Sequence, residues 1–526
     1  MGPEIIASCR EGFRTFRPFN MNEVRVRFAP SPTGALHIGG IRTALYNFLL
    51  ARKFKGTMIL RIEDTDQARY VPGAEEYILE SLAWAGIQID EGVGPGGPHA
   101  PYRQSERKGI YQEYARKLVD TGKAYYAFDT AEELEQMRQR FANSQYDGIT
   151  RLQMKNSLSL PMEEVQKRLS SGQGYVIRIQ VPAHEEILVH DLMRGDVTVH
   201  SSQIDDKVLM KSDGMPTYHL ANVVDDYLMR ISHVIRGDEW LPSAPLHVLL
   251  YKFLGWENDM PQFAHLPLLL KPDGNGKLSK RDADRMGFPI FPLNWKDPES
   301  GETSIGFREQ GFLPEALINF LALLGWNPGT TQEIFSLDEL IQAFTTERVG
   351  KAGAKFDIQK AHWFNQQYLR AKSGEELGGY LLASLKKENI DCTLAKAIRV
   401  AEALRERVTF PKDFWEQGKF FFKAPTTFDE QVVTRKWTAD AIRVLDAYQK
   451  EIGLIGDLTT EIAKAILEQV TSTLGVKTGQ ILAALRVSLT GGASGPDLMQ
   501  SMEILGSEET VRRISYALKT LGPKPS

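Results

Sequence analysis

The sequence predicts an α/β protein built on a Rossmann-type parallel sheet, with an α+β insertion and an all-α C-terminal half. Three observations support this fold class. Strand-like and helix-like patterns alternate over residues 24–85, and the same alternation resumes over 208–250 after a mixed segment. After about residue 310, apolar residues recur almost everywhere at helical spacing.

The first α/β segment begins with a short strand. Residues 24–28 alternate between apolar and basic side chains, and Pro and Gly residues follow them. Residues 41–53 carry apolar side chains every three or four positions, which indicates a helix. A second strand is expected at 57–62 and a second helix at 74–85. This order of elements predicts a parallel sheet.

A mixed segment, residues 102–206, interrupts this pattern. Its helical and strand-like patterns lie at 131–141, 162–171, 175–181 and 196–201. Because the segment lies between two halves of one α/β pattern, we expect an inserted subdomain. A strand at 231–236 and a helix at 245–253 are then expected to continue the sheet.

The C-terminal half is expected to be helical. Its clearest helical patterns lie at 313–324, 395–407, 459–473, 479–489 and 508–521. The predicted organisation is an N-terminal extension without fixed structure at 1–21, a Rossmann-type domain at 22–101 and 207–270, an insertion at 102–206, a lysine-loop domain at 271–370 and a helical region at 371–526.

Composition excludes some classes of protein. A chain of 526 residues is long enough for several domains, and no apolar run approaches the ~20 residues that span a bilayer, so we expect no membrane partner. The net charge of −4 does not indicate nucleic-acid binding, but a local basic face would be enough for such binding. The two cysteines, Cys9 and Cys392, cannot form a disulfide framework or a four-cysteine zinc site, which favours a reducing compartment.

The first motif with chemical content is PSPTGALHIGG at residues 30–40. A strand that ends in this Pro- and Gly-rich turn would deliver His37 to the start of a helix. Gly39 and Gly40 have no side chain, so a nucleotide could approach the backbone, and helix N–H groups there would favour phosphate. His37 could donate to phosphate oxygens as charge develops. The alternative is a simple helix-capping turn with His37 as an incidental surface residue.

The second motif is KLSKR at 277–281, in a loop rich in Gly, Asp and Lys. Lys277 and Lys280 could neutralise charge on a transferring phosphoryl group and on departing pyrophosphate. The alternative is a solvated basic loop.

Together, in this order, the two motifs resemble those of class I aminoacyl-tRNA synthetases. The strings at 61–66, 97–107, 211–222, 234–240 and 475–480 resemble the glutamyl branch of bacterial type. The first motif departs from the family pattern because it ends in Gly40 instead of histidine, so His37 would carry more of the donor role.

The resemblance implies ligation of L-glutamate to tRNA(Glu) with ATP and Mg²⁺, by a cytoplasmic monomer that activates glutamate and then transfers it to the tRNA. It implies ATP binding by His37, Gly39, Gly40, Lys277, Lys280 and Arg281, with His37, Lys277 and Lys280 as catalytic residues. Some relatives carry zinc in the insertion, but the corresponding stretch at 125–129 has no cysteine, so we expect no structural zinc.

The resemblance also implies a glutamate site. Arginine suits carboxylates, and a carboxylate suits an ammonium group. The implied glutamate ligands are Arg27, Tyr218 and Arg236 for the carboxylates, Ser31 and Glu63 near the amino end, and Asn222. Alternatives remain: Arg236 could pair with Asp238 or Glu239, Arg27 could lie on an exposed strand, and Glu63 could pair with a basic neighbour.

The helical C-terminal half implies an α-helical anticodon-binding region. Basic and aromatic residues that could form its surface are Arg399, Arg405, Arg407, Lys412, Phe414, Trp415, Lys419 and Lys423; alternatively they form a solvated helix face with core aromatics. A hydrophobic lobe is expected at 285–306.

The rival functions are a glutaminyl enzyme, a tRNA-modifying paralogue and a catalytically silent tRNA-binding protein. The sequence does not say whether the enzyme also charges tRNA(Gln) with glutamate.

Overall fold

The computed structural model describes residues 23–140 and 145–522. The extension expected at 1–21 lies outside these residues. The chain divides into two compact units, one formed by the described residues up to Gly306 with Ile318–Asp357, the other by Phe307–Leu317 with the described residues from Ile358 on. Each unit is described by itself, and the predicted domain boundaries stay a prediction.

The first unit is built on a seven-stranded sheet with the order β3-β2-β1-β9-β10-β6-β7. Its strands are β1 (Arg25–Phe28), β2 (Thr57–Leu60), β3 (Glu91–Gly92), β6 (Glu186–Asp191), β7 (Gly195–His200), β9 (His233–Gly237) and β10 (Gln262–Leu266). All pairs from β3 to β6 are parallel, and only β6 and β7 run antiparallel.

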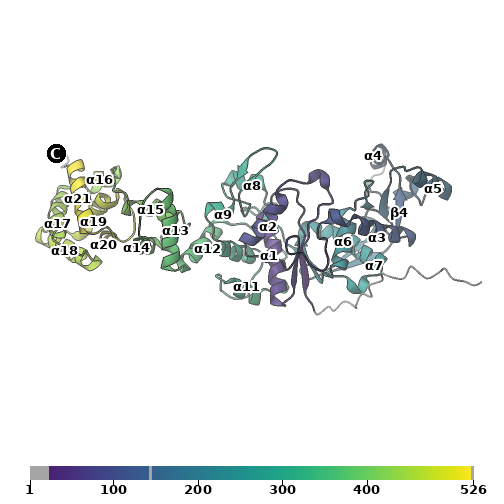
Figure 1. Ribbon diagram of the computed structural model, residues 1–526, viewed down its shortest axis with the longest axis horizontal. Helices are drawn as coiled ribbons and strands as arrows, with labels where there is room; N and C mark the ends of the chain where they lie inside the picture. Colours follow the sequence, from purple (N-terminus) through teal and green to yellow (C-terminus); the bar gives the residue numbers. More distant parts are fainter. Residues whose placement is uncertain (1–22, 141–144, 523–526) are drawn as a thin grey trace, which may run out of the picture. The chain divides into compact units, whose positions relative to one another are not determined.

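Helices cover both faces of this sheet, as expected when the strand order runs outward in both directions from one point of a parallel sheet. In Figure 1, α1 (Ile38–Lys53) and α2 (Ala74–Trp84) lie on one side of the strands, and α6 (Tyr218–Leu228) and α7 (Ala244–Leu254) lie on the other. Every residue of β1 is buried because the strand is covered on both faces. The strand order reverses between β1 and β9. This is the position at which open α/β sheets bind ligands.

The segment predicted as an insertion contributes to two sheets. β4 (Ala124–Ala127), β5 (Val176–Ile179) and β8 (Val208–Met210) form a separate three-stranded sheet. In contrast, β6 and β7 extend the central sheet, where the buried residues of β6 alternate along the strand. The hydrogen bonding therefore crosses the predicted boundary at 206: β6 and β7 belong with the Rossmann strands, and β8 belongs with β4 and β5. The helices of this segment are α3 (Lys108–Asp120), α4 (Ala131–Arg140) and α5 (Met162–Ser170).

The lobe expected at 285–306 is a small hairpin with a buried apolar side. β12 (Trp295–Lys296) pairs antiparallel with β13 (Thr303–Ser304). The Tyr77 hydroxyl donates to the Leu293 carbonyl at 2.6 Å, and the Tyr77 and Trp295 rings meet edge to face at 5.0 Å. The lobe is thus anchored to α2. The unit also contains β11 (Leu269–Leu270), β14 (Ala354–Lys355), α8 (Lys280–Met286) and α11 (Leu337–Ala343).

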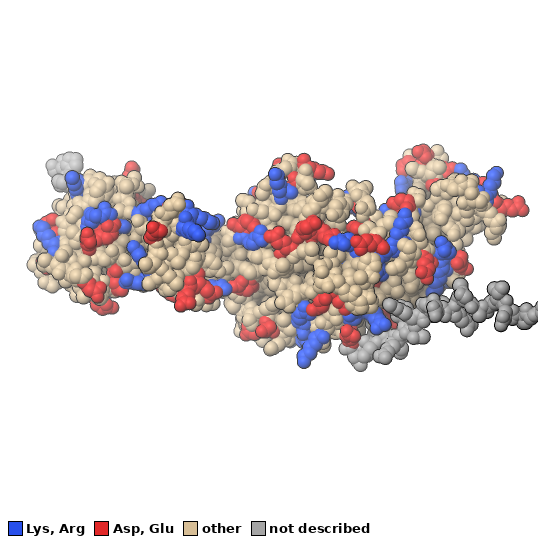
Figure 2. All heavy atoms as spheres, viewed as in Figure 1, with Lys and Arg blue, Asp and Glu red and all other residues tan. Residues whose placement is uncertain are grey.

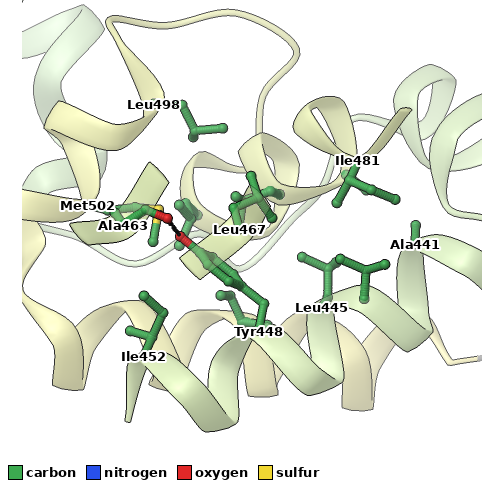
Figure 3. Close-up of a cluster of buried hydrophobic side chains, with 14 of the residues drawn as sticks. Ala441, Leu445, Tyr448, Ile452, Ala463, Leu467, Ile481, Leu498 and Met502 are labelled. Carbon is green, nitrogen blue, oxygen red and sulfur yellow. Dashed lines mark hydrogen bonds between the residues drawn. The ribbon is translucent and has the colours of Figure 1, made fainter. Parts of the chain in front are cut away.

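The second unit is helical. Its helices, with the connecting helix α10, are α9 (Phe307–Gln310), α10 (Pro314–Leu323), α12 (Ile358–Ala371), α13 (Gly374–Lys387), α14 (Leu394–Leu404), α15 (Asp413–Gly418), α16 (Glu430–Lys436), α17 (Ala439–Ile452), α18 (Thr460–Thr473), α19 (Thr478–Thr490), α20 (Leu498–Leu505) and α21 (Ser507–Leu521). Figure 3 shows one of its cores, where Tyr448 lies among Leu445, Leu467 and Met502. The Tyr448 hydroxyl donates to the Ala463 carbonyl at 2.8 Å. The predicted fold class, a Rossmann-type sheet domain followed by a helical half, is confirmed.

Acidic and basic side chains are interspersed over the face shown in Figure 2. No extended patch of one sign covers that face, in keeping with the small net charge of −4. None of the helices in the described part of the chain combines the length and apolar character that crossing a bilayer requires.

Candidate active site

A pocket of about 1130 Å³, measured with its open mouth, lies at the carboxyl ends of β1 and β9. It therefore lies at the point where the strand order reverses. Ten of the predicted site residues line it: Arg27, Ser31, His37, Gly39, Gly40, Glu63, Tyr218, Asn222, Arg236 and Lys277. Lys280 and Arg281 are not among its lining residues.

His37 is the N-cap of α1. Its Nδ1 accepts a hydrogen bond from the Gly39 N–H at 3.0 Å, so a neutral imidazole carries its proton on Nε2. The side chain is open to the pocket. The surrounding protein atoms displace water from the His37 ring, and this desolvation lowers its pKa. The Lys277 ammonium lowers the pKa further, whereas the Glu239 carboxylate raises it. His37 is therefore a neutral donor at pH 7.

The start of α1 differs from expectation in two ways. The helix begins at Ile38 rather than at residue 41, so the two glycines lie inside its first turn. The N–H groups expected to be available for phosphate also have partners: Ile38 donates to the Ile290 carbonyl at 2.9 Å, and Gly40 donates to the His37 carbonyl at 2.8 Å. The helix dipole and the His37 Nε2–H remain as the features that favour an anion.

The glycines have a local steric role. A Cβ on Gly39 would lie 2.7 Å from the His37 ring, and a Cβ on Gly40 would lie 2.3 Å from the Leu36 side chain. The absence of side chains is therefore required by the turn itself, in addition to leaving the pocket wall open.

The lysine loop places its two cations differently. Lys277 lines the pocket and lies 3.3 Å from Glu239 Oε1, in an ion pair that is about half exposed. Lys280 is the first residue of α8, and its ammonium lies 6.0 Å from the centre of the Phe291 ring. Ser279 caps α8 in a reciprocal pair of hydrogen bonds with Asp282. Lys280 thus lies beside the hydrophobic lobe and is not among the residues that line the pocket.

A buried ionic cluster supports one wall of the pocket, to which it contributes Arg27 and Glu63. Arg27 Nε and Arg61 Nη1 bind Asp226 Oδ1 at 3.0 and 2.8 Å, and Arg61 Nη2 binds Glu63 Oε1 at 3.0 Å. All four side chains are buried. Burial alone would raise the pKa of Asp226, but the two guanidinium groups outweigh it and hold that pKa below its ordinary value. Burial raises the pKa of Glu63, opposed by Arg61 and Arg27.

Two of the alternatives raised from the sequence can now be compared with geometry. Arg27 is 3% exposed, so the interpretation of an exposed strand position is wrong. Glu63 does pair with a basic neighbour, Arg61, and it also lines the pocket. Asn222 lies between these groups; in the orientation that satisfies its amide, the oxygen accepts from Arg27 and Arg61, each at 3.2 Å, and the nitrogen donates to Asp226.

Behind this wall, Asp225 accepts hydrogen bonds from Arg107 at 2.7 Å, Gln104 at 2.9 Å and Tyr111 at 2.8 Å. Sequence reasoning assigned no role to Asp225, Asp226 or Arg61. The available signal was a pair of adjacent aspartates directly after the apolar residues Val223 and Val224 of α6, since buried carboxylates need partners.

Two buried arginines that line the pocket, Arg236 and Arg42, have no carboxylate among their hydrogen-bond partners, whereas Arg27 pairs with Asp226. Arg42 donates to the Leu324 and Pro267 carbonyls, and Arg236 is held by side chains. Arg236 is 4% exposed and donates to His265 Nε2 at 2.9 Å, to the Tyr218 hydroxyl at 2.9 Å and to His247 Nδ1 at 3.2 Å. The two acidic partners considered from sequence are engaged elsewhere: Asp238 pairs with Arg194 at 2.8 Å and Glu239 with Lys277. The alternative of a structural ion pair for Arg236 is therefore wrong.

The helical unit contains the basic and aromatic residues singled out from sequence. Phe414 is completely buried in a core, so it belongs to the interior rather than to a binding surface. Trp415 is partly buried, with the Lys423 ammonium 5.0 Å from its ring centre. Over residues 23–140 and 145–522, no three His, Cys, Asp or Glu side chains gather to hold a metal. The absence of structural zinc stays a prediction.

Comparison with known proteins identifies the class. Residues 23–363 match the family described as "tRNA synthetases class I (E and Q), catalytic domain", and residues 368–518 match "Anticodon binding domain". With its parallel sheet and its pocket at the switch point, the chain is a class I aminoacyl-tRNA synthetase.

Individual relatives narrow this class. The chain is 62% identical to the glutamate–tRNA ligase of Cytophaga hutchinsonii, covering 95% of this chain and 98% of that protein, and 55% identical to the one of Phocaeicola vulgatus, covering 95% and 99%. A crystal structure of a glutamate tRNA ligase from Elizabethkingia meningosepticum matches with a TM-score of 0.92 at 49% identity, covering 95% of this chain and 100% of that one. The chain belongs to the glutamate–tRNA ligase family, as the motifs predicted.

Proposed function

We propose that this chain ligates L-glutamate to tRNA(Glu) in two steps. The α-carboxylate of glutamate attacks the α-phosphate of ATP and displaces pyrophosphate, giving glutamyl-adenylate. The 2′-hydroxyl of the terminal tRNA adenosine then attacks the activated carbonyl and AMP leaves. The observation that carries this proposal is the buried Arg236, a cation without a carboxylate partner, in one pocket with His37 and Lys277.

The glutamate roles follow from charge. Arg236 and Tyr218 would receive the side-chain carboxylate of glutamate. The Arg236 guanidinium has no anionic partner of its own among the described residues, and the Tyr218 hydroxyl accepts from it at 2.9 Å. Arg27 would attract the α-carboxylate. Glu63 and Ser31 would receive the ammonium group. Asn222, which contacts Arg27, Arg61 and Asp226, would keep the charged groups beside Glu63 in place. Glutamine would leave the buried Arg236 cation unpaired, and so would bind less well.

The ATP roles follow from the His37 turn and the lysine loop. Gly39 and Gly40 leave the pocket wall open beside the His37 Nε2–H, which would donate to a phosphate oxygen. Lys277, Lys280 and Arg281 would neutralise the departing pyrophosphate. Because Lys280 rests on Phe291, this role requires the loop to move toward the pocket when ATP is present. We propose that Mg²⁺ enters with the triphosphate, whose oxygens are its preferred ligands.

The helical unit would bind the tRNA anticodon, and the segment 102–206 the acceptor end. We further propose that the enzyme works as a monomer in the cytoplasm. Two cysteines in 526 residues suit a reducing compartment.

Pyrophosphate exchange tests the proposal. Purified enzyme is incubated with glutamate, Mg-ATP and labelled pyrophosphate, with and without tRNA(Glu), and label in ATP is measured. Exchange that depends on glutamate and tRNA is expected. Absence of exchange in the presence of tRNA(Glu) would support the silent tRNA-binding protein instead. Charging of tRNA(Gln) in parallel separates a strict enzyme from a relaxed one.

Lysine variants test the loop. Lys280→Ala is expected to lower the rate of activation by at least ~10², the scale for losing one transition-state donor. Lys277→Ala should act similarly. Lys296→Ala, an exposed lysine on the hairpin of the neighbouring lobe, is the matched control and should keep the wild-type rate. Wild-type turnover by Lys280→Ala would show that the loop takes no part in phosphoryl transfer.

A further inference from the structure

Two neutral histidines hold Arg236 in place. Its Nε donates to His265 Nε2 at 2.9 Å and its Nη1 lies 3.2 Å from His247 Nδ1. Both histidines are fully buried. A buried arginine usually has a carboxylate beside it, as Arg27 and Arg61 have here. Around Arg236, imidazoles occupy the positions where those carboxylates would be expected.

The state of His265 is set by Asp191. His265 Nδ1 lies 2.6 Å from Asp191 Oδ2, so Nδ1 carries the proton and the Nε2 lone pair faces Arg236. Asp191 is itself fixed, because its other oxygen accepts from the N–H groups of Met193 and Arg194 at 3.0 and 2.8 Å. Three adjacent strands build this row: Arg236 and His265 are register partners on β9 and β10, and Asp191 ends β6.

His247 is oriented by a second histidine. Its Nδ1 accepts from Arg236, so its Nε2 carries the proton and donates to His219 Nδ1 at 3.3 Å. Burial lowers the pKa of His247 well below its ordinary value, and burial is also the main cause that lowers the pKa of His219, to about 4. Burial also lowers the pKa of His265, although Asp191 opposes this. All three imidazoles are therefore neutral at pH 7.

We propose that His265 and His247 are positioning residues that fix the Arg236 guanidinium without neutralising it, and thereby set the preference for a substrate with a side-chain carboxylate. The inference rests on the proposed function, in which Arg236 receives a glutamate carboxylate. An imidazole lone pair satisfies an N–H donor but carries no charge. The positive charge of Arg236 thus stays available for the substrate.

The charge argument gives a prediction with a definite sign. A carboxylate at position 265 or 247 would pair with Arg236 and compete with the substrate. A neutral amide would preserve the hydrogen bonds, because the Gln oxygen can accept from Arg236 while its NH₂ donates to Asp191. An aliphatic side chain would leave Arg236 Nε without an acceptor. The three substitutions should therefore separate positioning, charge and packing.

The experiment measures glutamylation of tRNA(Glu) with saturating ATP for wild type, H265Q, H265L, H247Q and H247E. The KM for glutamate should rise about tenfold to a hundredfold in H265L, the scale for losing a hydrogen bond to a charged group, with a smaller change in kcat. H265Q and H247Q should stay within about threefold of wild type. H247E should raise the KM for glutamate at least tenfold and narrow the preference for glutamate over glutamine. H233L, on the same strand as Arg236 and without contact to it, is the control and should leave the KM unchanged.

The outcomes are distinguishable. Failure of wild type to glutamylate the tRNA would overturn the proposed function itself. With active wild type, an unchanged KM in H265L and H247E, or equal losses in H265Q and H265L, would overturn the inference. Thermal melting of each variant identifies any that fail to fold. If H265L fails to fold, the KM of H247E for glutamate still tests the inference, because this variant leaves Asp191 and His265 paired.

Discussion

Asp226→Asn should unbalance the buried ionic cluster. In wild type, Asp226 accepts from Arg27 Nε at 3.0 Å, from Arg27 Nη2 at 3.3 Å and from Arg61 Nη1 at 2.8 Å. Three cations, Arg27, Arg61 and Arg107, face three carboxylates, Glu63, Asp225 and Asp226. The substitution removes one negative charge with almost no change in shape, so one buried guanidinium loses its counter-charge.

The expected cost is large. Arg61 keeps Glu63 and Asp225 as partners, so the stranded cation is Arg27. Asp226 is 2% exposed and Arg27 is 3% exposed, so water cannot replace the lost partner. Removing one member of a buried ion pair typically costs about 3–5 kcal/mol. At the lower end, local opening of α6 would become ~150-fold more frequent, since 1.36 kcal/mol corresponds to a factor of ten.

Hydrogen exchange measured by mass spectrometry on peptides from α6 reports this opening directly. Asp66→Asn is the matched control: Asp66 pairs with Arg69 at 2.6 Å, but both side chains are exposed, so exchange in α6 should not change. Arg27→Met combined with Asp226→Asn should restore part of the loss, because it removes the stranded cation. Exchange in Asp226→Asn as slow as in the control would refute the argument that charge balance stabilises this wall.

Two further predictions concern single buried groups. Tyr448→Phe removes the donor to the Ala463 carbonyl and should cost about 1 kcal/mol in local opening of α17 and α18, measured by exchange, whereas Tyr516→Phe, at an exposed position, should cost nothing measurable. The pKa of His219 is about 4 in the folded protein, against 6.5 for an ordinary histidine, so the unfolded chain binds its proton first as pH falls. Stability should therefore decrease from pH 6.5 down to 4, by at most about 3 kcal/mol for this group, and thermal melting of His219→Gln should show a weaker acid dependence. An identical acid dependence in that variant would assign the effect to other groups.

The fold was predictable because its main signals are local. The alternation at 24–28, the apolar strand at 57–62 and the helical spacing after residue 310 are each patterns within a few neighbouring residues. The placement of β6 and β7 was not predictable in this way. Strand-like patterns do not say which sheet a strand joins, and pairing of β10 with β6 links Phe263 with Asp191, far apart in the sequence.

In the pocket, too, local sequence patterns were predictable and contacts between distant segments were not. Its two motifs could be recognised because each is continuous in sequence, and Lys277 and His37 do line the same pocket. Motifs do not reveal which N–H groups are already engaged, as those of Ile38 and Gly40 are. They also do not reveal where a loop rests, as Lys280 does on Phe291. The partners of Ile38 and Lys280 are Ile290 and Phe291, which belong to the lobe at 285–306 and to neither motif.

Charge balance connects these observations. The arginines of the pocket differ in what surrounds them: Arg27 is held by a carboxylate, and Arg236 by imidazoles. Since both are buried, this difference sets how strongly each attracts an anionic ligand. On the proposed function, Arg27 would bind a carboxylate only alongside Asp226, whereas Arg236 would gain its first anionic partner when the ligand arrives. Selection between glutamate and glutamine should therefore depend more on Arg236 and its histidines than on Arg27, although both arginines line the same pocket.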